Sequence, residues 1–587
     1  MAVGLQSLIG NARQFVKDNI WLRDEDGRYV LFRGANFASR CKLFPYLPIV
    51  PSNSPSITAQ NLKTEIELVK PKLGYLKTLG FNIVRLLVMW KAIEPTPNPD
   101  LNKLMPEGEQ YLQMVKEIVD ALYDQGLFII IDFHQDIAHE VYNGDGFPDW
   151  ALAIDETHPR PLQATHKDKS WAAAYYLNPL VRHTLQSFWK NNLRNIEAGL
   201  ENYRVRTHLE RTITQTVKFF KALNDNQGHP AILGFEIFNE PHPVGLGKKS
   251  FEESFLKEFY SNVIAEINKV DDKVFVLIQP RVDWNIYPAN EVTESKLDWS
   301  KFSTPDSVSD LQLAFVQDPT QIRSWLPTDS IFLDQLKSQG VFSFHYYDPW
   351  TLFYSFFNIA DNMHNKQLEW PKIFEQMQKE AVSRNLIPFL TEFGGSQDWE
   401  IIPTNLGPDS VYHTKQIRAY MDLQYNQIES YILNSIYWNY DLYETKENKD
   451  NWNLENFSLL GPDRTPRNID IVARPYPMYS SAKPLMLSFN LETKYWVLIM
   501  SGSIVNAPTI IYIPYVIHFL PAFSTWATST AVKWDPSNQL LYWYPDNSQE
   551  YNQIIVTPSQ DLNNNLLPKE SKDLLKKTVY VGKFGAK

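Results

Sequence analysis

Eight short apolar runs recur along the first 475 residues of the chain, separated by longer polar or amphipathic stretches. The runs do not alternate between apolar and polar residues, which is typical of strands buried on both faces of a parallel sheet. Two intervening stretches, 64–79 and 108–125, have the apolar spacing of amphipathic helices. Eight strand-then-helix units predict an α/β fold, the (β/α)8 barrel, with long insertions. The runs cover residues 29–36, 82–88, 127–133, 232–238, 274–278, 341–345, 388–392 and 435–440.

An open, doubly wound parallel sheet would show the same alternation of strands and helices. However, none of the eight runs is followed by the Gly-rich fingerprint that binds nucleotides in such sheets, so the barrel is favoured. Two connections, 136–210 and 285–335, are longer than a barrel needs, and both follow strands. Loops after strands lie on the catalytic face of a barrel, so we expect these two to form walls or lids there.

The pattern changes near residues 474–480, after which short runs rich in β-branched and aromatic residues follow one another. They predict a second domain, an all-β sandwich at 476–587, after a barrel at 1–475. No Gly/Ser-rich linker separates the two, which favours a sandwich packed firmly on the barrel over an independent carbohydrate-binding module. The polar segment 561–577 is expected to be a loop or a short surface helix. The expected strands are 494–499, 509–514, 531–534, 540–544 and 550–556.

Charge and cysteine content exclude some classes of protein. A net charge of −11 argues against nucleic acid as a partner, and the single cysteine, Cys41, excludes an intramolecular disulfide. The N-terminal apolar residues are interrupted by Gln6, Asn11 and Arg13, unlike a signal peptide. No stretch approaches the roughly 18 apolar residues of a transmembrane helix. We therefore expect a monomer that is cytoplasmic, or that is secreted without a signal peptide.

Two apolar runs end abruptly in a glutamate, Glu240 in FEIFNEP and Glu392 in FLTEFGG. Acids at the carboxyl ends of barrel strands point into the mouth of the barrel. A pair of carboxyl groups on opposite sides of one bond suits glycoside hydrolysis, with one as proton donor and the other as nucleophile. Other polar or aromatic candidates fall within or at the ends of the predicted strands: Arg85, His134, Asp136, Asn239, His345, Tyr347 and Trp438.

These motifs resemble a known family. FNEP and the TEFG glutamate are similar to clan A glycoside hydrolases, family 5 in particular, and DFHQD at 132–136 with GDGFPDWA at 144–151 resembles its endoglycoceramidase branch. The resemblance extends to GANFASRCKLFPY at 34–46, RPYP at 474–477 and IYIPYVIHF at 511–519. It implies a retaining β-glycosidase that cleaves the bond between a sugar and ceramide, or a related lipid aglycone.

The resemblance also implies a role for each candidate. Glu240 would be the general acid and then the general base, and Glu392 the nucleophile, with carboxyl groups about 5–5.5 Å apart. Arg85 would lower the pKa of Glu392 and keep it ionised. Asn239 would bind the sugar 2-hydroxyl, and His134, Asp136 and Lys42 would bind other sugar groups. Tyr347 would orient the nucleophile, and His345 would orient the acid. Trp438 would form the floor of the sugar subsite.

No cofactor or metal is expected. His134, Asp136, His139 and Glu140 offer possible ligands, but they lack the HExxH spacing of a zinc protease helix, and the family that the chain resembles needs no metal.

An unusually apolar segment, 348–363, follows the sixth predicted strand. We interpret it as an apolar lip that receives a lipid aglycone or touches a membrane or micelle surface, although a helix burying one side would look the same. A second aromatic cluster, at 171–189, either forms a wall opposite this lip or packs in the core. The lip candidates are Trp350, Phe353, Phe356 and Phe357.

Several activities remain open. The enzyme could release whole oligosaccharides from ceramide, or act as an exo-glucosidase on glucosylceramide or steryl glucosides. A cellulase or mannanase of the same family is a further alternative, and so is a catalytically silent protein that binds glycolipids.

Overall fold

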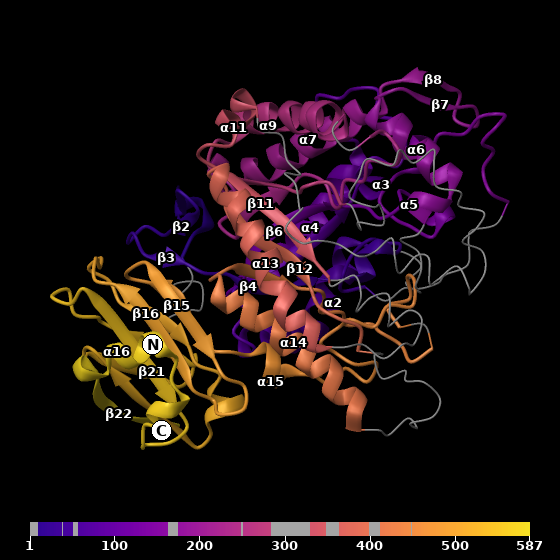
Figure 1. The fold of residues 1–587 in the computed structure, drawn as a ribbon. Coiled ribbons are helices and arrows are strands. Elements are labelled where there is room, and N and C mark those ends of the chain that lie inside the picture. The colour runs from indigo at the N-terminus through magenta and orange to yellow at the C-terminus, as the bar shows by residue number, and fades with distance from the viewer. Residues whose placement is uncertain are drawn as a thin grey trace.

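A computed structural model describes residues 10–37, 39–50, 57–162, 174–247, 250–282, 329–347, 363–397, 411–447 and 449–586. Eight parallel strands close into a barrel in the order β10-β11-β12-β13-β4-β5-β6-β9 (Figure 1). The last strand, β13, pairs in parallel with the first, β4, which brings Ser435 opposite Arg33 and closes the ring. The predicted barrel is confirmed. Its strands are β4 (Arg33–Phe37), β5 (Ile83–Met89), β6 (Phe128–His134), β9 (Ile232–Glu236), β10 (Phe275–Ile278), β11 (Gly340–Tyr346), β12 (Ile387–Phe393) and β13 (Asn434–Tyr437).

Helices between the strands cover the outside of the barrel (Figure 1). The two stretches predicted from their periodicity are α2 (Ala59–Thr78) and α4 (Pro106–Asp124). Helix α4 begins with a proline at its first turn, where no backbone N–H is needed, and with Glu107 and Glu109 beside the positive end of the helix dipole. The other long helices are α7 (Val205–Asn226), α9 (Lys257–Val270), α13 (Met363–Ser383) and α14 (Val411–Ser430).

The insertion after β6 contains short helices and a hairpin. Its elements are η3 (Glu140–Tyr142), η4 (Asp149–Ala151), α5 (Ala174–Leu177), α6 (Pro179–Trp189), β7 (Leu193–Asn195) and β8 (Leu200–Tyr203). In the aromatic cluster at 171–189, Tyr175, Phe188 and Trp189 are buried core residues. The insertion after β10 and the lip candidates Trp350, Phe353, Phe356 and Phe357 lie largely or wholly outside the described residues.

The C-terminal part forms two antiparallel sheets. The first has the order β1-β2-β3-β14-β17-β20-β19 and the second β15-β16-β21-β18-β22. All five predicted strands are present, and 561–577 contains only short helical turns. The strands are β14 (Tyr476–Ser480), β15 (Pro484–Phe489), β16 (Trp496–Ser501), β17 (Thr509–Tyr512), β18 (Ala522–Ala527), β19 (Val532–Asp535), β20 (Leu540–Trp543), β21 (Tyr551–Thr557) and β22 (Val579–Gly585).

The first sheet crosses the domain boundary expected after residue 475. Strands β1 (Val16–Asp18), β2 (Trp21–Arg23) and β3 (Tyr29–Val30) come from the N-terminal segment, and β3 pairs with β14. In Figure 1 they appear in indigo beside the orange domain. The run 29–36 therefore does not form one strand: its start belongs to this sheet and its end to the barrel.

The two parts of the molecule share a buried core. Phe32, Ile83 and Phe128 of the barrel cluster with Tyr476 and Tyr512 of the first sheet. The Tyr512 hydroxyl donates to the Thr78 carbonyl at 2.6 Å, and its ring lies so close to the backbone of Gly80 that a Cβ there would be 2.3 Å from it. This contact requires glycine and fixes the sheet against the barrel.

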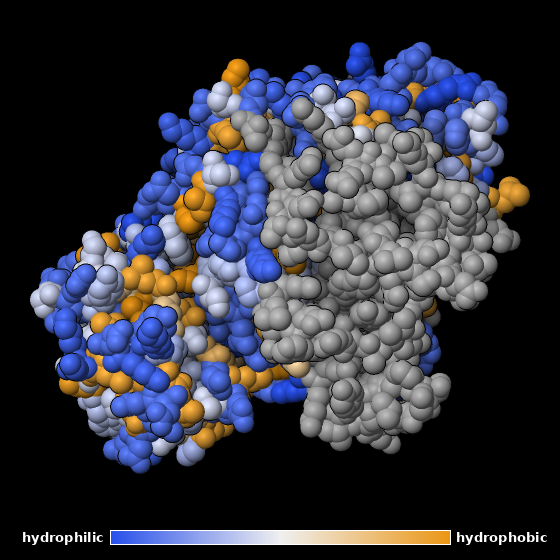
Figure 2. Space-filling model, viewed as in Figure 1, coloured by the Kyte–Doolittle hydropathy of each residue, from blue (hydrophilic) through white to orange (hydrophobic). Residues whose placement is uncertain are grey.

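The outer surface of the C-terminal domain carries both apolar and hydrophilic residues. Figure 2 shows apolar residues among hydrophilic ones on this domain, which exposes Leu485, Val516, Leu520 and Val579. In the described part of the chain, no helix combines the length and the apolar character needed to cross a bilayer.

Candidate active site

Glu240 and Glu392 lie together at the carboxyl ends of the barrel strands. Glu240 follows β9 by four residues in a left-handed backbone conformation, with φ +46°, and Glu392 is the second-last residue of β12. Both side chains are buried, and each offers a carboxylate oxygen within 4.8 Å of the other. Two acids at this separation can act on the two sides of one glycosidic bond.

Glu392 is held by a cation and a phenol. The Arg85 guanidinium donates to its Oε1 at 2.5 Å, and the Tyr347 hydroxyl donates to its Oε2 at 3.0 Å. Burial nevertheless raises the pKa of Glu392 above its usual range, while His345 and Arg85 oppose that rise. Arg85 thus lies beside Glu392 and lowers its pKa, as expected, but desolvation outweighs the charge of the guanidinium and the net shift is upward.

Among the residues that the structure describes, no lysine or arginine bonds to the Glu240 carboxyl group. Its Oε1 lies 2.8 Å from Nδ1 of His345. Burial, followed by the negative charge of Asp136, raises the pKa of Glu240 to about 8. A carboxyl group with this pKa retains its proton at neutral pH, so the two acids occupy environments suited to different roles.

A buried glutamine fixes the hydrogen positions around Glu240. Gln279 Oε1 accepts from the Glu240 backbone N–H at 2.9 Å, so the amide nitrogen must face the other way, toward Glu236 Oε1 at 2.5 Å and His345 Nε2 at 3.0 Å. An amide nitrogen only donates, so His345 Nε2 must accept. Neutral His345 then carries its hydrogen on Nδ1 and donates it to Glu240 Oε1. The acid proton of Glu240 consequently belongs on Oε2.

Arg85 is fully buried at the centre of the site. It forms ion pairs with Asp132 at 3.0 Å, Glu236 at 2.5 Å and Glu392 at 2.5 Å. Its NH2 group also donates to Asn239 Oδ1 at 2.8 Å, which leaves the Asn239 amide nitrogen free to face Gln135 O at 3.0 Å. Because all three guanidinium nitrogens are used, Arg85 sets the positions of groups on β6, β9 and β12 at once.

Lys42, Asp136, His134 and Trp438 form a second cluster beside the acids. Lys42 Nζ donates to Asp136 Oδ2 at 2.6 Å, and the same oxygen lies 3.1 Å from His134 Nε2. The His134 ring stacks on Trp438 with centroids 5.8 Å apart, and Lys42 lies 4.8 Å above the same tryptophan. Asn239 Nδ2 lies 3.4 Å from Asp136 Oδ1 and joins this cluster to Arg85. All ten residues predicted for the site thus form one connected network.

Charges in this cluster are strongly shifted. Burial opposes the charged forms, but the carboxylates of Asp132 and Asp136 raise the pKa of His134 to about 10. Lys42 and His134 in turn outweigh burial and lower the pKa of Asp136 to about 2. The cluster therefore holds a carboxylate with cationic donors at neutral pH, a combination that binds sugar hydroxyls well.

Sequence reasoning missed Asp132 and Glu236, which pair with Arg85, and also Gln279 and Asp145. Gln279 carries no charge and follows a short strand, so no pattern marks it. Asp145 is buried, and its pKa is raised to about 8, chiefly by burial. Its carboxylate lies 3.9 Å from Lys42, and within the described residues neither oxygen has a hydrogen-bond partner. In the sequence, the motif GDGFPDWA at 144–151 contains Asp145 and could have indicated that it belongs to the site.

The four residues considered as metal ligands do not form one group. His134 and Asp136 gather with Asp145, whereas His139 and Glu140 gather with Asp149. Lys42 contacts the first group through Asp136, and Lys91 contacts the second through Asp149 at 2.8 Å. A cationic side chain already balances each set of carboxylates.

Comparison with known proteins agrees with this geometry. The family described as Cellulase (glycosyl hydrolase family 5) matches residues 69–443, and the glycoside hydrolase family 5 C-terminal domain matches residues 474–557. Endoglycoceramidase I of Rhodococcus hoagii is 27% identical over 281 residues, which is 46% of this chain and 47% of that protein. A glucosylceramidase of Rhizopus delemar is 26% identical over 260 residues, or 39% of this chain and 35% of that protein. The chain thus aligns with about half, or less, of the length of these relatives.

Solved structures share the fold along nearly the whole chain. Endo-glycoceramidase II from Rhodococcus sp., in its ganglioside GM3 complex, is 21% identical with a TM-score of 0.60 and covers 92% of this chain and 99% of its own. Sterylglucosidase 1 of Cryptococcus neoformans is 14% identical with a TM-score of 0.67 and covers 94% of this chain and 98% of its own. With more than half of its length matched by the family profile, the chain belongs to glycosyl hydrolase family 5.

Proposed function

We propose that the protein is a retaining β-glycosidase that cleaves the bond between glucose, or a glycan, and ceramide. The observation that carries the reaction type is that one carboxylate oxygen of Glu240 and one of Glu392 lie within 4.8 Å of each other, with His345 Nδ1 at 2.8 and 3.5 Å from the two carboxylates. An inverting enzyme needs about 6.5–9.5 Å between its carboxyl groups to hold a water molecule, whereas a retaining enzyme has about 5–5.5 Å.

In the first step Glu240 gives its Oε2 proton to the glycosidic oxygen while Glu392 attacks the anomeric carbon. The bond to the lipid alcohol breaks, its electron pair stays with the departing oxygen, and a covalent glycosyl ester forms on Glu392. In the second step Glu240, now a carboxylate, removes a proton from water, which attacks the same carbon and releases Glu392. No electrons are gained or lost overall.

The surrounding residues prepare both steps. Arg85 and Tyr347 hold Glu392 for attack by direct hydrogen bonds. We assign Asn239 to the sugar 2-hydroxyl, a contact that strengthens as positive charge develops on the ring. Lys42, His134 and Asp136 would bind further hydroxyls, and Trp438, stacked on His134, would form the floor of the sugar subsite.

A lipid glucoside is the substrate class that the comparisons support. Curated relatives include endoglycoceramidases and glucosylceramidases. The lip candidates Trp350, Phe353, Phe356 and Phe357 would receive the aglycone and touch a membrane or micelle surface. Steryl glucosides are the second candidate, because the sterylglucosidase fold overlaps this chain with the higher TM-score, 0.67 against 0.60.

Product analysis on glucosylceramide, a steryl glucoside and a ganglioside tests the proposal. Free glucose from glucosylceramide and nothing from the ganglioside would identify an exo-acting glucosylceramidase. Intact oligosaccharide from the ganglioside would identify an endo-acting enzyme. Hydrolysis of a soluble β-glucan alone would refute the glycolipid assignment. Binding without turnover of any glycoside would refute the enzymatic one.

The lip is tested separately. Replacing Phe353, Phe356 and Phe357 together with serine should reduce activity on glycolipid much more than activity on a small aryl glucoside. Equal losses on both substrates would contradict a role in binding the lipid.

A further inference from the structure

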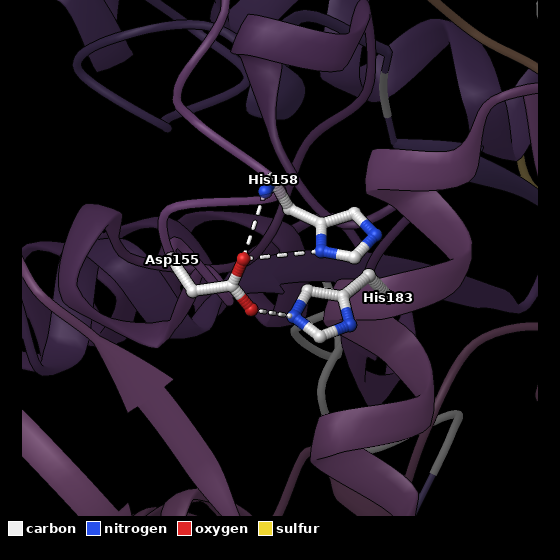
Figure 3. A group of neighbouring side chains, drawn as sticks. All are labelled: Asp155, His158 and His183. Carbon is white, nitrogen blue, oxygen red and sulfur yellow. Dashed lines mark hydrogen bonds and ion pairs between the residues drawn. The ribbon is translucent and has the colours of Figure 1, made fainter.

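The insertion after β6 holds a second group of side chains, apart from the ten residues of the predicted site. Asp155 and His158 belong to one tight turn, and His183 projects from helix α6 toward them (Figure 3). One nitrogen of each imidazole faces the Asp155 carboxylate, and the three residues offer ligand atoms within 4.8 Å of one another. The side chains are partly exposed, from 14% for Asp155 to 31% for His158, so an ion from solvent can reach them.

The turn fixes the Asp155 carboxylate before any ligand arrives. Its Oδ1 accepts from the backbone N–H groups of Thr157 and His158, each at 2.8 Å, and from the Thr157 hydroxyl at 2.7 Å. This leaves Oδ2 directed at His183. A carboxylate oriented by hydrogen bonds from its own turn is the usual support of a metal ligand.

The contact between Asp155 and His183 is short, but its geometry is not that of a hydrogen bond. His183 Nε2 lies 3.0 Å from Asp155 Oδ2. Yet this nitrogen, buried from solvent, has no hydrogen-bond partner of acceptable geometry among the described residues. A buried polar atom that faces another across a short distance without bonding to it marks a place where a ligand can satisfy both.

We propose that Asp155, His158 and His183 form a binding site for a divalent transition-metal ion of the zinc type. Two imidazole nitrogens and one carboxylate are a ligand set that Zn²⁺ prefers, with bonds of about 2.0–2.2 Å, and water can complete the tetrahedron. An ion between Asp155 Oδ2 and the two nitrogens replaces the unaligned contact with three bonds.

Binding changes the geometry of the two histidines. Their rings now stack with centroids 4.0 Å apart and planes 13° apart. An ion midway between them would lie outside both ring planes, so the rings must turn toward it and the stack must open. His158 must also carry its hydrogen on Nε2, because Nδ1 then uses its lone pair for the metal.

The ion would brace a wall of the active site. Ile154, next to Asp155, pairs with Asn195 of β7, and α6 packs through Phe188 on Phe147, two residues from Asp145. Joining the 155–158 turn to α6 therefore fastens the insertion that also supplies Asp136 and Asp145. This role does not depend on which glycoside the enzyme cleaves.

Calorimetric titration of the chelator-treated full-length protein with Zn²⁺ tests the site. We expect one ion per chain and a melting temperature that rises with Zn²⁺ concentration. Affinity should fall at least 10-fold in His183→Ala and in the milder His158→Gln. Co²⁺ should give the visible spectrum of a tetrahedral nitrogen and oxygen site in the wild type alone.

His139→Gln is the matched control, because His139 belongs to a different group of possible ligands. It should leave the Zn²⁺ affinity unchanged. The proposal is overturned if the wild type binds no Zn²⁺, if His183→Ala and His158→Gln bind it as the wild type does, or if His139→Gln abolishes binding. Circular dichroism of each variant separates lost binding from lost folding.

Discussion

Replacing Gln279 with glutamate would remove the two hydrogen bonds that its amide nitrogen donates, to Glu236 and to His345, while it preserves the shape of the side chain. One new carboxylate oxygen still accepts from the Glu240 backbone, but the other replaces the amide nitrogen that donates to Glu236 and to His345 Nε2. His345 Nε2 then faces an acceptor and gains a proton. The variant therefore places an imidazolium 2.8 Å from Glu240.

The size of the effect follows from the charges. A cation hydrogen-bonded to a buried carboxyl group lowers its pKa by about 1–3 units. A fall of about 1.5 units would move the pKa of Glu240 from about 8 to roughly 6.5. At pH 7.5 the protonated fraction of Glu240 would fall from roughly three quarters to about a tenth, so kcat/KM should fall about eightfold. At pH 5.5 Glu240 stays protonated and the loss should be much smaller.

The assay is the pH dependence of kcat/KM on an aryl β-glucoside for the wild type and Gln279→Glu. The argument that Gln279 sets the tautomer of His345 would be refuted in either of two cases. The variant could lose the same factor of kcat/KM at every pH, or the fall in its kcat/KM at alkaline pH (the alkaline limb) could occur at the same pH as in the wild type. Gln215→Glu is a control because Gln215 is similarly buried but lies on α7 outside the barrel. It should reduce stability without moving the alkaline limb.

Three further predictions concern the same site. Glu392→Gln should lower kcat by about 10⁴-fold or more while glycolipid binding survives, measured by initial rates and by titration. In the wild type, kcat/KM should fall above about pH 8, because Glu240 loses the proton that it must donate, and a flat profile to pH 9.5 would contradict this. Lys42→Met should destabilise the fold by up to about 3–5 kcal/mol, because the buried Asp136 carboxylate then keeps only His134 as a cationic partner. Chemical denaturation should show much of that loss restored in Lys42→Met combined with Asp136→Asn.

The sequence predicted the barrel because its strands are buried on both faces and therefore read as continuous apolar runs. Runs such as 127–133 and 341–345 match the observed strands to within a residue or two at each end. The strands β1 and β3 have only three and two residues, too few for any periodicity, so the N-terminal contribution to the second domain was not visible.

The candidate site was predictable where a charged or aromatic side chain follows a strand. Gln279 could not be found in this way. Its importance lies in its hydrogen bonds to Glu240, Glu236 and His345, which only the structure shows. The net rise in the pKa of Glu392 could not be predicted for a related reason. The charge of Arg85 is evident from the sequence, but the extent of desolvation depends on neighbours supplied by every strand of the barrel.

The pairing of β3 with β14 has a consequence for synthesis of the protein. Val30 meets its partner Tyr479 only after about 450 further residues have been added. At about 5–20 residues per second, the ribosome takes roughly 20–90 s to supply it. Throughout that time the nascent chain carries an open strand edge, which is a template for pairing with other chains. A fragment that stops after the barrel would keep this edge permanently, so we expect it to aggregate.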